Sequence, residues 1–325
     1  MTGRLPYLDY ARVFVVYLVI FGHLLPMDNH IPRDFIYAFH MPFFFLVSGM
    51  LHKNTGVIQW RKYLRTIGVP LLFFNLLYLF VVNPIFWKYG VFGTSTEGYI
   101  ELWRQGIARG WNGLLYNGNI PSGVTWFLVA LLWCKLLMDF VYCKPRSGIA
   151  LFIIFFCGTI ILKFPSFYFR NAMMVFPFYF MGSYYKAQIE SLVYCPKSYS
   201  LALLCLFLLI FIVLLNGRVS TKGVGFGHFP YHLNIVLFYI GALAGSLMML
   251  IISTFFKTNQ AVTYIATSLI TILGMQAVFC DIYRNLFQPD HYEIMIPLAV
   301  VIMYACTGIH WFIMRYAPFL LEKRG

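Results

Sequence analysis

Apolar segments follow one another along nearly the whole chain, and each is about 20 residues long, the length that a transmembrane helix needs. Hydrophobic residues make up 61% of the 325 residues and charged residues only 11%, which is far from the composition of a soluble domain. The sequence therefore predicts an all-α polytopic membrane protein with about ten transmembrane helices. The predicted spans are centred near Val16, Phe44, Phe74, Leu131, Ile154, Phe178, Phe207, Leu243, Ile270 and Val301.

These segments leave no stretch long enough for a separate soluble domain, and no sequence repeat interrupts them. We therefore expect a single membrane domain over residues 1–325. The first apolar segment carries Arg12 and His23 and lacks a small-x-small cleavage site, so it is predicted to stay in the protein as a membrane span rather than to act as a cleaved signal peptide.

Lysine and arginine residues in the connecting segments indicate the orientation. In a layout of ten spans, most of their clusters fall on the same side as Arg4, and the positive-inside rule makes that side cytoplasmic. Both termini are therefore expected in the cytoplasm, although nine basic residues would fall on the outer side: Arg33, Lys88, Arg104, Arg109, Lys163, Arg170, Arg218, Lys222 and Arg284. The inner set comprises Lys53, Arg61, Lys62, Arg65, Lys144, Arg146, Lys186, Lys197, Lys257, Arg315, Lys323 and Arg324.

The net charge of +13 comes from basic residues that flank the spans, so it indicates topology and attraction to anionic lipid. The lipid bilayer is an expected partner, and nucleic acid is not. The seven cysteines show no CxxC spacing and lie mostly within or beside apolar segments, which predicts no disulfide framework and no metal site. No GxxxxGK[ST] loop is present to bind a nucleotide.

The first span contains ionisable residues, which are costly in lipid and usually line an internal cavity. Arg12 and His23 are eleven residues apart, so on a helix they lie within about 20° of one face and about 16 Å apart along the axis. A cation near the inner end and an imidazole near the outer end point to a buried reaction site. Alternatively, Asp9 and Arg12 form an interfacial ion pair and His23 is a helix-end residue at the headgroups.

The stretch FHMPFFFLVSGM, residues 39–50, places His40 near the start of the second span, which returns from the outer side. His23 and His40 are therefore expected to face each other at a similar depth, where two imidazoles suit proton transfer at neutral pH. His40 by itself is equally compatible with a buried histidine that only fulfils its hydrogen bonds. Ser48 and Gly49 predict a close approach to another helix.

Three motifs together carry a resemblance to a known family. They are YLDYARVFVVYLVIFGH at residues 7–23, with an Arg-x10-His pattern at Arg12 and His23; FHMPFFFLVSG at 39–49; and KYLR at 62–65, followed by Pro70. TWFLVALLW at 125–133 and FPFYFMGSYY at 176–185 are weaker matches. With these motifs the chain resembles the membrane acyltransferase-3 family and, within it, the branch of fucose 4-O-acetylase-like sugar O-acetyltransferases.

The resemblance implies a multi-pass enzyme of the plasma (bacterial inner) membrane that transfers acetyl from acetyl-CoA to a sugar hydroxyl. The acyl-CoA donor is cytoplasmic, and the acceptor is a surface polysaccharide or a lipid-linked glycan. On this reading, His23, Arg12 and His40 are catalytic. The phosphates of coenzyme A would be bound by Arg12, Lys62 and Arg65 at the inner ends of the helices. Whether His23 acts as a general base or first accepts the acyl group is left open.

One departure from the family lies near the ninth span. Many relatives carry a histidine a few residues after a Ser-Leu pair, whereas no histidine follows Ser268 and Leu269 before the span ends. A role of that histidine therefore cannot be transferred to this chain, and the Arg-x10-His motif is unaffected.

Two further segments bear on the ligands. The connection over residues 83–122 is rich in tryptophan and tyrosine, which suits the apolar face of a sugar or, alternatively, an interfacial aromatic belt. His228 and His232 in GHFPYH have helical spacing, but Pro230 lies between them, so we interpret the stretch as a loop and not as a metal site.

A different function class remains open from the sequence alone. In a proton-coupled transporter or flippase of glycan, lipid or small solute, the intramembrane arginine and histidine would form a proton relay. A non-catalytic membrane scaffold is a third reading. The basic motifs gather at one inner end beside the first three spans, and no pair of corresponding broken helices indicates inverted repeats, which favours the enzyme.

Overall fold

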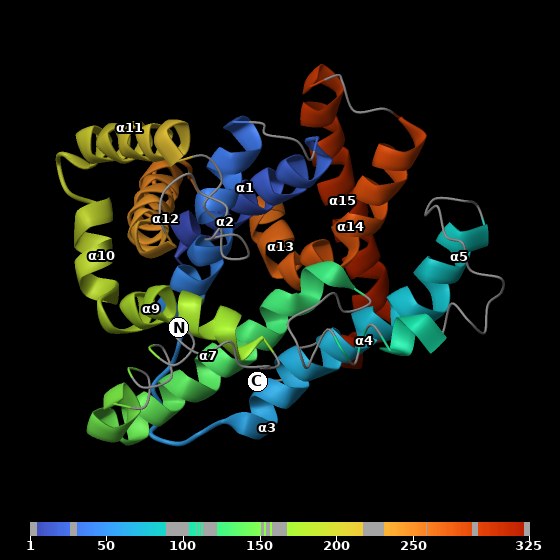
Figure 1. The fold of residues 1–325 in the computed structure, drawn as a ribbon, viewed down its shortest axis with the longest axis horizontal. Helices are drawn as coiled ribbons and strands as arrows, with labels where there is room; N and C mark the ends of the chain where they lie inside the picture. The colour runs from blue at the N-terminus through green and yellow to red at the C-terminus, as the bar shows by residue number, and fades with distance from the viewer. Residues whose placement is uncertain are drawn as a thin grey trace. The chain divides into compact units, whose positions relative to one another are not determined.

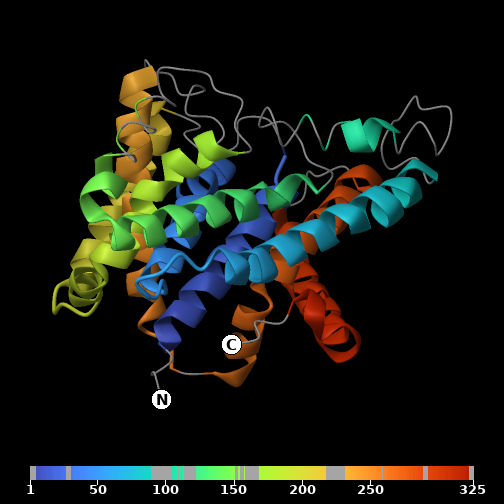
Figure 2. The same ribbon diagram turned by 90° about the horizontal axis from the view of Figure 1, so that it is seen from below.

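The computed structural model describes residues 5–26, 31–88, 104–108, 110, 112, 122–150, 153, 157, 168–216, 231–257, 259–287 and 292–321. Every regular element in these ranges is a helix, so the prediction of an all-α protein is confirmed for the described residues (Figures 1 and 2). The predicted span near Ile154 and most of the aromatic segment 83–122 lie outside them.

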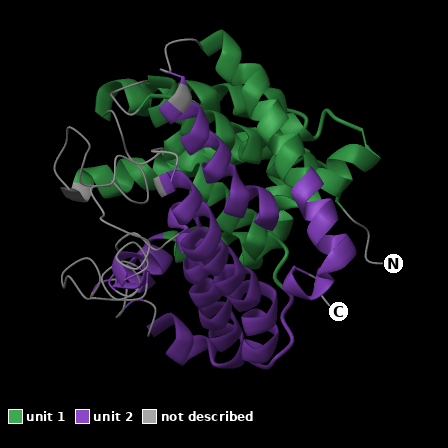
Figure 3. Ribbon diagram, turned by 90° about the vertical axis from the view of Figure 1, so that its right-hand side faces the viewer, with its two compact units in different colours: residues 1–52, 175–269, 289–307 green, residues 53–174, 270–288, 308–325 purple. Residues whose placement is uncertain are grey.

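The chain divides into two compact units (Figure 3). The first unit contains residues 1–52, 175–269 and 289–307, and the second contains residues 53–174, 270–288 and 308–325. The expectation of one domain over residues 1–325 stays a prediction.

The core of the first unit is formed by α1 (Pro6–Leu24), α2 (Ile31–Met50) and α12 (Tyr231–Ser253), which pack on one another (Figure 1). Around this core, α11 (Ser198–Asn216) contacts α2 and α12, α10 (Lys186–Val193) contacts α12, and α13 (Gln260–Thr267) contacts α1. The unit also includes the second part of α9 (Phe169–Tyr184) and the first part of α15 (Tyr292–Tyr316).

The second unit is built on two long helical segments. One comprises α3 (Trp60–Tyr63), η1 (Leu64–Gly68), α4 (Val69–Leu77), η2 (Tyr78–Val82) and α5 (Asn83–Lys88). The other comprises η3 (Gly123–Thr125) and α7 (Trp126–Cys143), and α7 packs against α3 and η1. The unit also contains α14 (Leu269–Leu286) from residue 270 on, the part of α9 up to residue 174, the part of α15 from residue 308 on, and η5 (Pro318–Leu320).

Two π-helical turns, η1 and η2, interrupt the segment that begins at Trp60, and each lies just before a proline, Pro70 or Pro84. Proline has no N–H, so the carbonyl four residues earlier loses its α-helical donor. The wider turn supplies hydrogen bonds from five residues ahead and keeps the segment helical. Such turns are frequent at functional sites, and the first one carries Arg65.

Six helices in the described residues are long and apolar enough to cross a membrane. A seventh span is formed if α13 and α14, which bend by 75° at Ser268, are taken together. α2 is helical over 20 residues but less apolar, because Arg33, Asp34 and His40 interrupt it. The count of about ten and the cytoplasmic termini stay predictions. The six helices are Pro6–Leu24, Trp60–Phe86, Gly123–Cys143, Ser198–Asn216, Leu233–Ser253 and Tyr292–Tyr316.

Within the first unit, α2 and α9 are in direct backbone contact. A Cβ added at Gly49 would overlap the carbonyl of Tyr179, and one added at Gly182 would overlap the carbonyl of Leu46. The two glycines therefore allow the helices to touch main chain to main chain. The close approach predicted at Gly49 is confirmed.

This contact predicts that Gly182→Ala destabilises the protein by about 1–3 kcal/mol, because the new methyl group forces the two backbones apart. The matched control is Gly308→Ala on α15, where an added Cβ meets nothing within 4 Å. The control should be neutral or slightly stabilising, since alanine favours a helix over glycine by about 1 kcal/mol. Thermal unfolding of both variants in detergent measures the difference. Equal melting temperatures would contradict the tight contact.

Candidate functional site

The N-terminal end of α1 carries an ion pair. Pro6 begins the helix, and Asp9 lies in its first turn, where a carboxylate is favoured by the helix dipole. The guanidinium of Arg12 pairs with the Asp9 carboxylate, and its Nε donates to the Leu8 carbonyl oxygen at 3.2 Å. Asp9 is only 2% exposed, whereas the Arg12 side chain keeps 20% of its surface exposed. The pair that the sequence offered as an alternative is therefore present, and it leaves Arg12 accessible.

His23 lies in the last turn of α1, which ends at Leu24 ahead of Pro26. Its Nδ1 atom is 3.2 Å from the hydroxyl of Tyr37 on α2. Because α1 is unbroken from Pro6 to Leu24, Arg12 and His23 lie near one face, about 16 Å apart along the axis, as the spacing predicted.

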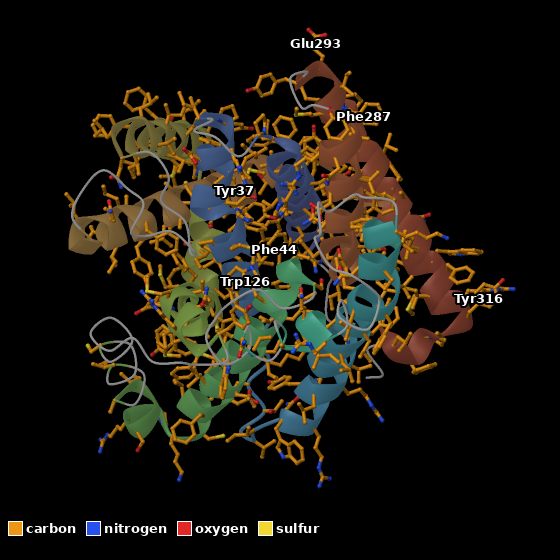
Figure 4. The ribbon with its side chains drawn as sticks, turned by 45° about the vertical axis from the view of Figure 1, so that its right-hand side comes forward. Tyr37, Phe44, Trp126, Phe287, Glu293 and Tyr316 are labelled. Carbon is orange, nitrogen blue, oxygen red and sulfur yellow. The ribbon has the colours of Figure 1, made fainter. Side chains whose placement is uncertain are left out.

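Tyr37 joins the two histidines that the sequence singled out. The centroid of its ring is 5.9 Å from that of His23 and 4.9 Å from that of His40, both in edge-to-face contacts. The structure thus brings His23 and His40 together around Tyr37, which is labelled in Figure 4. We call these three residues the imidazole cluster.

The hydrogen bond of His40 defines its tautomer. Nδ1 lies 3.0 Å from the carbonyl oxygen of Ile36, and a carbonyl can only accept, so Nδ1 carries the proton. In a neutral imidazole the lone pair is then on Nε2, which is the form that a general base requires. His40 is 6% exposed, so this geometry is held inside the protein.

Arg33 lies at the edge of the imidazole cluster, and its guanidinium is 5.1 Å from the centroid of the Tyr37 ring, a cation–π contact. Arg33, Tyr37 and His40 follow an i, i+4, i+7 spacing on α2, so they share one helix face. The sequence reading missed Arg33 and Tyr37 as site residues. That spacing relative to His40 would have been the signal, had the helix been expected to begin as early as Ile31.

Lys62 and Arg65, the predicted donor-binding residues, belong to the second unit, and both are exposed. Tyr63 between them is buried, and its hydroxyl donates to Oδ1 of Asp139 on α7 at 3.0 Å. The backbone N–H of Gln59 donates to Oδ2 of the same carboxylate at 2.8 Å. Asp139 therefore anchors the start of α3 to α7 and leaves the basic side chains on the outside.

Further basic residues occur at the same end of the second unit. The Cys143 thiol, at the end of α7, donates to the Gly56 carbonyl oxygen at 3.2 Å, which joins the loop before α3 to the end of α7. We call this region the basic end. Its exposed members are Lys53, Arg61, Lys62, Arg65, Lys144 and Arg146.

Another polar pair lies in the second unit, where no histidine follows Ser268 and Leu269 in the sequence. His310 on α15 approaches Thr271 on α14, and its Nδ1 is 2.9 Å from the Thr271 hydroxyl oxygen, with both side chains buried. An imidazole therefore lies near the start of α14, supplied by a helix 39 residues farther along the chain. The sequence alone gave no sign of this contact.

No group of three or more histidine, cysteine, aspartate or glutamate residues suited to a metal ion occurs in the described part of the chain. The cysteines found there are free thiols. His228 and the side chain of His232 lie outside the described residues, as does most of the segment predicted to meet the acceptor.

A comparison with known families identifies the family to which these residues belong. The model of the acyltransferase-3 family, described as an acyltransferase domain, matches residues 5–316. The match includes both ends of α1, the imidazole cluster and the basic end, and it favours an enzyme over a transporter, flippase or scaffold. No curated protein and no solved structure matches the chain. Because the match spans nearly the entire sequence, the chain belongs to the acyltransferase-3 family and is a membrane acyltransferase.

Proposed function

We propose that the protein transfers acetyl from cytoplasmic acetyl-CoA to a hydroxyl of a sugar in a surface polysaccharide or a lipid-linked glycan, in the bacterial inner membrane. The observation that carries the proposal is α1, which has a cation at one end and an imidazole held by Tyr37 at the other. The choice of acetyl and sugar rests on the resemblance of the motifs at residues 7–23, 39–49 and 62–65 to the fucose 4-O-acetylase-like branch.

We assign the phosphates of the donor to three basic residues, Arg12, Lys62 and Arg65. Coenzyme A carries phosphates, which guanidinium groups bind through paired charge-assisted hydrogen bonds. Arg12 belongs to the first unit and is partly exposed, whereas Lys62 and Arg65 belong to the second unit and are exposed. Moving the charged part of the donor into the hydrocarbon core would be prohibitive, so only the acyl arm would enter. Along α1 it has to span about 16 Å between Arg12 and His23.

The imidazole cluster suits direct transfer. A basic imidazole nitrogen takes the proton from the sugar hydroxyl, and the oxygen attacks the thioester carbonyl carbon. The carbon–sulfur bond breaks, the imidazolium returns the proton to the departing thiolate, and free coenzyme A leaves. We assign the base to Nε2 of His23, with its Nδ1–H donating to the Tyr37 oxygen. His40, whose Nε2 also carries a lone pair, would orient the acceptor hydroxyl.

The direct test is acetylation of glycan by membranes that contain the protein, followed by mass spectrometry. Acetyl-CoA should add the mass of an acetyl group to the glycan, and His23→Ala should lower the rate by about a hundredfold or more, because the base is lost. The variant should still accumulate in the membrane, since alanine adds no polar group to α1. Unchanged acetylation by a well-expressed His23→Ala variant would exclude the proposed mechanism.

Tyr37→Phe should lower kcat by about tenfold, the effect of one lost hydrogen bond to the reacting imidazole, and leave KM for acetyl-CoA unchanged. The matched control is Tyr17→Phe on α1, whose hydroxyl donates to the Ile296 carbonyl oxygen at 3.3 Å, away from the imidazole cluster. The control should keep the wild-type kcat. If both variants lose activity equally, the role of Tyr37 is only structural.

Among the residues assigned to the donor, Arg12→Ala and the double variant Lys62→Ala with Arg65→Ala should each raise KM for acetyl-CoA. A lost charge-assisted contact is worth about 1.5–3 kcal/mol, which corresponds to about ten- to hundredfold in affinity. Arg61→Ala is the matched control, because this guanidinium lies over the Trp60 ring at 5.1 Å and is not assigned to the donor. An unchanged KM in both test variants would place the donor elsewhere.

A further inference from the structure

Arg33 is a buried cation in an unfavourable place. It is 6% exposed and lies in the first turn of α2. Burying a guanidinium costs several kcal/mol unless it is paired. The N-terminal turn of a helix also carries positive partial charge, so it favours anions and disfavours an arginine. Such a position calls for a negative group nearby.

The described neighbours of Arg33 do not supply that group. One terminal nitrogen donates to the Pro26 carbonyl oxygen at 2.9 Å, and the guanidinium lies over the Tyr37 ring. Its Nε atom is buried and has no hydrogen-bond partner among the described residues. The ion pairs found among the described residues, such as Arg12 with Asp9 and Arg284 with Asp281, do not include Arg33.

We propose that Arg33 is the anion subsite for the acceptor and that it binds a phosphate or carboxylate group carried by the sugar. A planar guanidinium matches two oxygens of such a group, and the unpartnered Nε is one of the donors available. The proposal rests on the proposed function where it names the acceptor as the carrier of the anion. An acidic sugar and a sugar linked to a lipid phosphate share this chemistry.

Arg33 and Arg12 lie on opposite sides of the imidazole cluster, so the anion of the acceptor and the phosphates of the donor would bind in different places. Arg33 is seven residues from His40 on the same helix face, which is about 10 Å along the axis and comparable to the span of a substituted sugar. It contacts Tyr37, which holds His23 at the far end of α1 from Arg12. The anion that Arg33 binds is thus on the opposite side of the imidazole cluster from the donor phosphates assigned to Arg12.

Anion binding can be measured without turnover, on the purified full-length protein in detergent. The probes are inorganic phosphate, glucuronate and a short-chain polyprenyl phosphate, and the readout is the melting temperature over a concentration series. At least one probe should raise the melting temperature of the wild type saturably and have no effect on Arg33→Gln. Arg33→Lys, which keeps the charge but not the planar fork, should respond more weakly than the wild type.

The three probes also distinguish the sources of the anion. A response to polyprenyl phosphate alone assigns a lipid-linked acceptor, and a response to glucuronate assigns an acidic sugar. A response to inorganic phosphate with either of them supports the same subsite. If no probe acts through Arg33, or if Arg33→Gln responds like the wild type, the proposal is overturned.

Stability without ligand provides the second measurement. Because Arg33 lacks a carboxylate partner in the described structure, Arg33→Gln should melt at or above the wild-type temperature in the absence of any anion. Arg284→Gln is the matched control: this residue pairs with Asp281 at 2.8 Å, so the variant should melt lower and keep the response to anions. A clear fall in the melting temperature of Arg33→Gln means that a group of the protein already neutralises Arg33, and this overturns the proposal.

Turnover separates this inference from the proposed function. In the acetylation assay, Arg33→Gln should raise KM for an anionic acceptor by about ten- to hundredfold, with KM for acetyl-CoA unchanged. If the wild type shows Arg33-dependent anion binding but transfers no acetyl, the proposed reaction fails and the anion subsite stands. If it transfers acetyl and the acceptor KM of Arg33→Gln is unchanged, the subsite fails and the proposed function stands.

Discussion

Hydrocarbon surroundings demand that each backbone N–H and C=O group is paired within the chain, and the described structure follows from that demand. Every regular element described is helical. Where Pro70 and Pro84 remove a donor, π-helical turns take over the hydrogen bonding and the span continues. Where α2 meets α9, Gly49 and Gly182 let the main chains touch, so close packing replaces the hydrophobic effect that is absent between helices in lipid.

The same demand applies to polar side chains, and it explains why the imidazole cluster is organised around Tyr37. A phenol can donate and accept, so its hydroxyl can hold His23 in either tautomer, and its ring makes an edge-to-face contact with His40. The Ile36 carbonyl then orients His40 from within α2 itself. Two histidines from different helices are thereby held in a defined geometry, which a site for proton transfer needs.

The buried carboxylates of Asp9 and Asp139 are stabilised in two different ways. Asp9 with Arg12 forms an ion pair, and Asp139 accepts from Tyr63 and Gln59, so the charge of each of these groups is balanced or solvated by hydrogen bonds. Arg33 is stabilised in neither way, since it has one backbone acceptor and one aromatic face. A buried cation without a carboxylate partner lowers the stability of the fold. Because Arg33 lies beside the imidazole cluster, the proposed binding of an anionic acceptor explains why the cation is there.

The sequence by itself determined the all-helical membrane fold, because apolar segments of about 20 residues have few other structures open to them. It also determined the relation between Arg12 and His23, because both lie on one helix and eleven residues bring them back to one face. Only the tertiary structure decided which residues meet across helices: Tyr37 with His23 and His40, Tyr63 with Asp139, and His310 with Thr271. The physical reason is that helical periodicity sets contacts within one helix, whereas the depth and rotation of neighbouring helices depend on packing over the whole bundle.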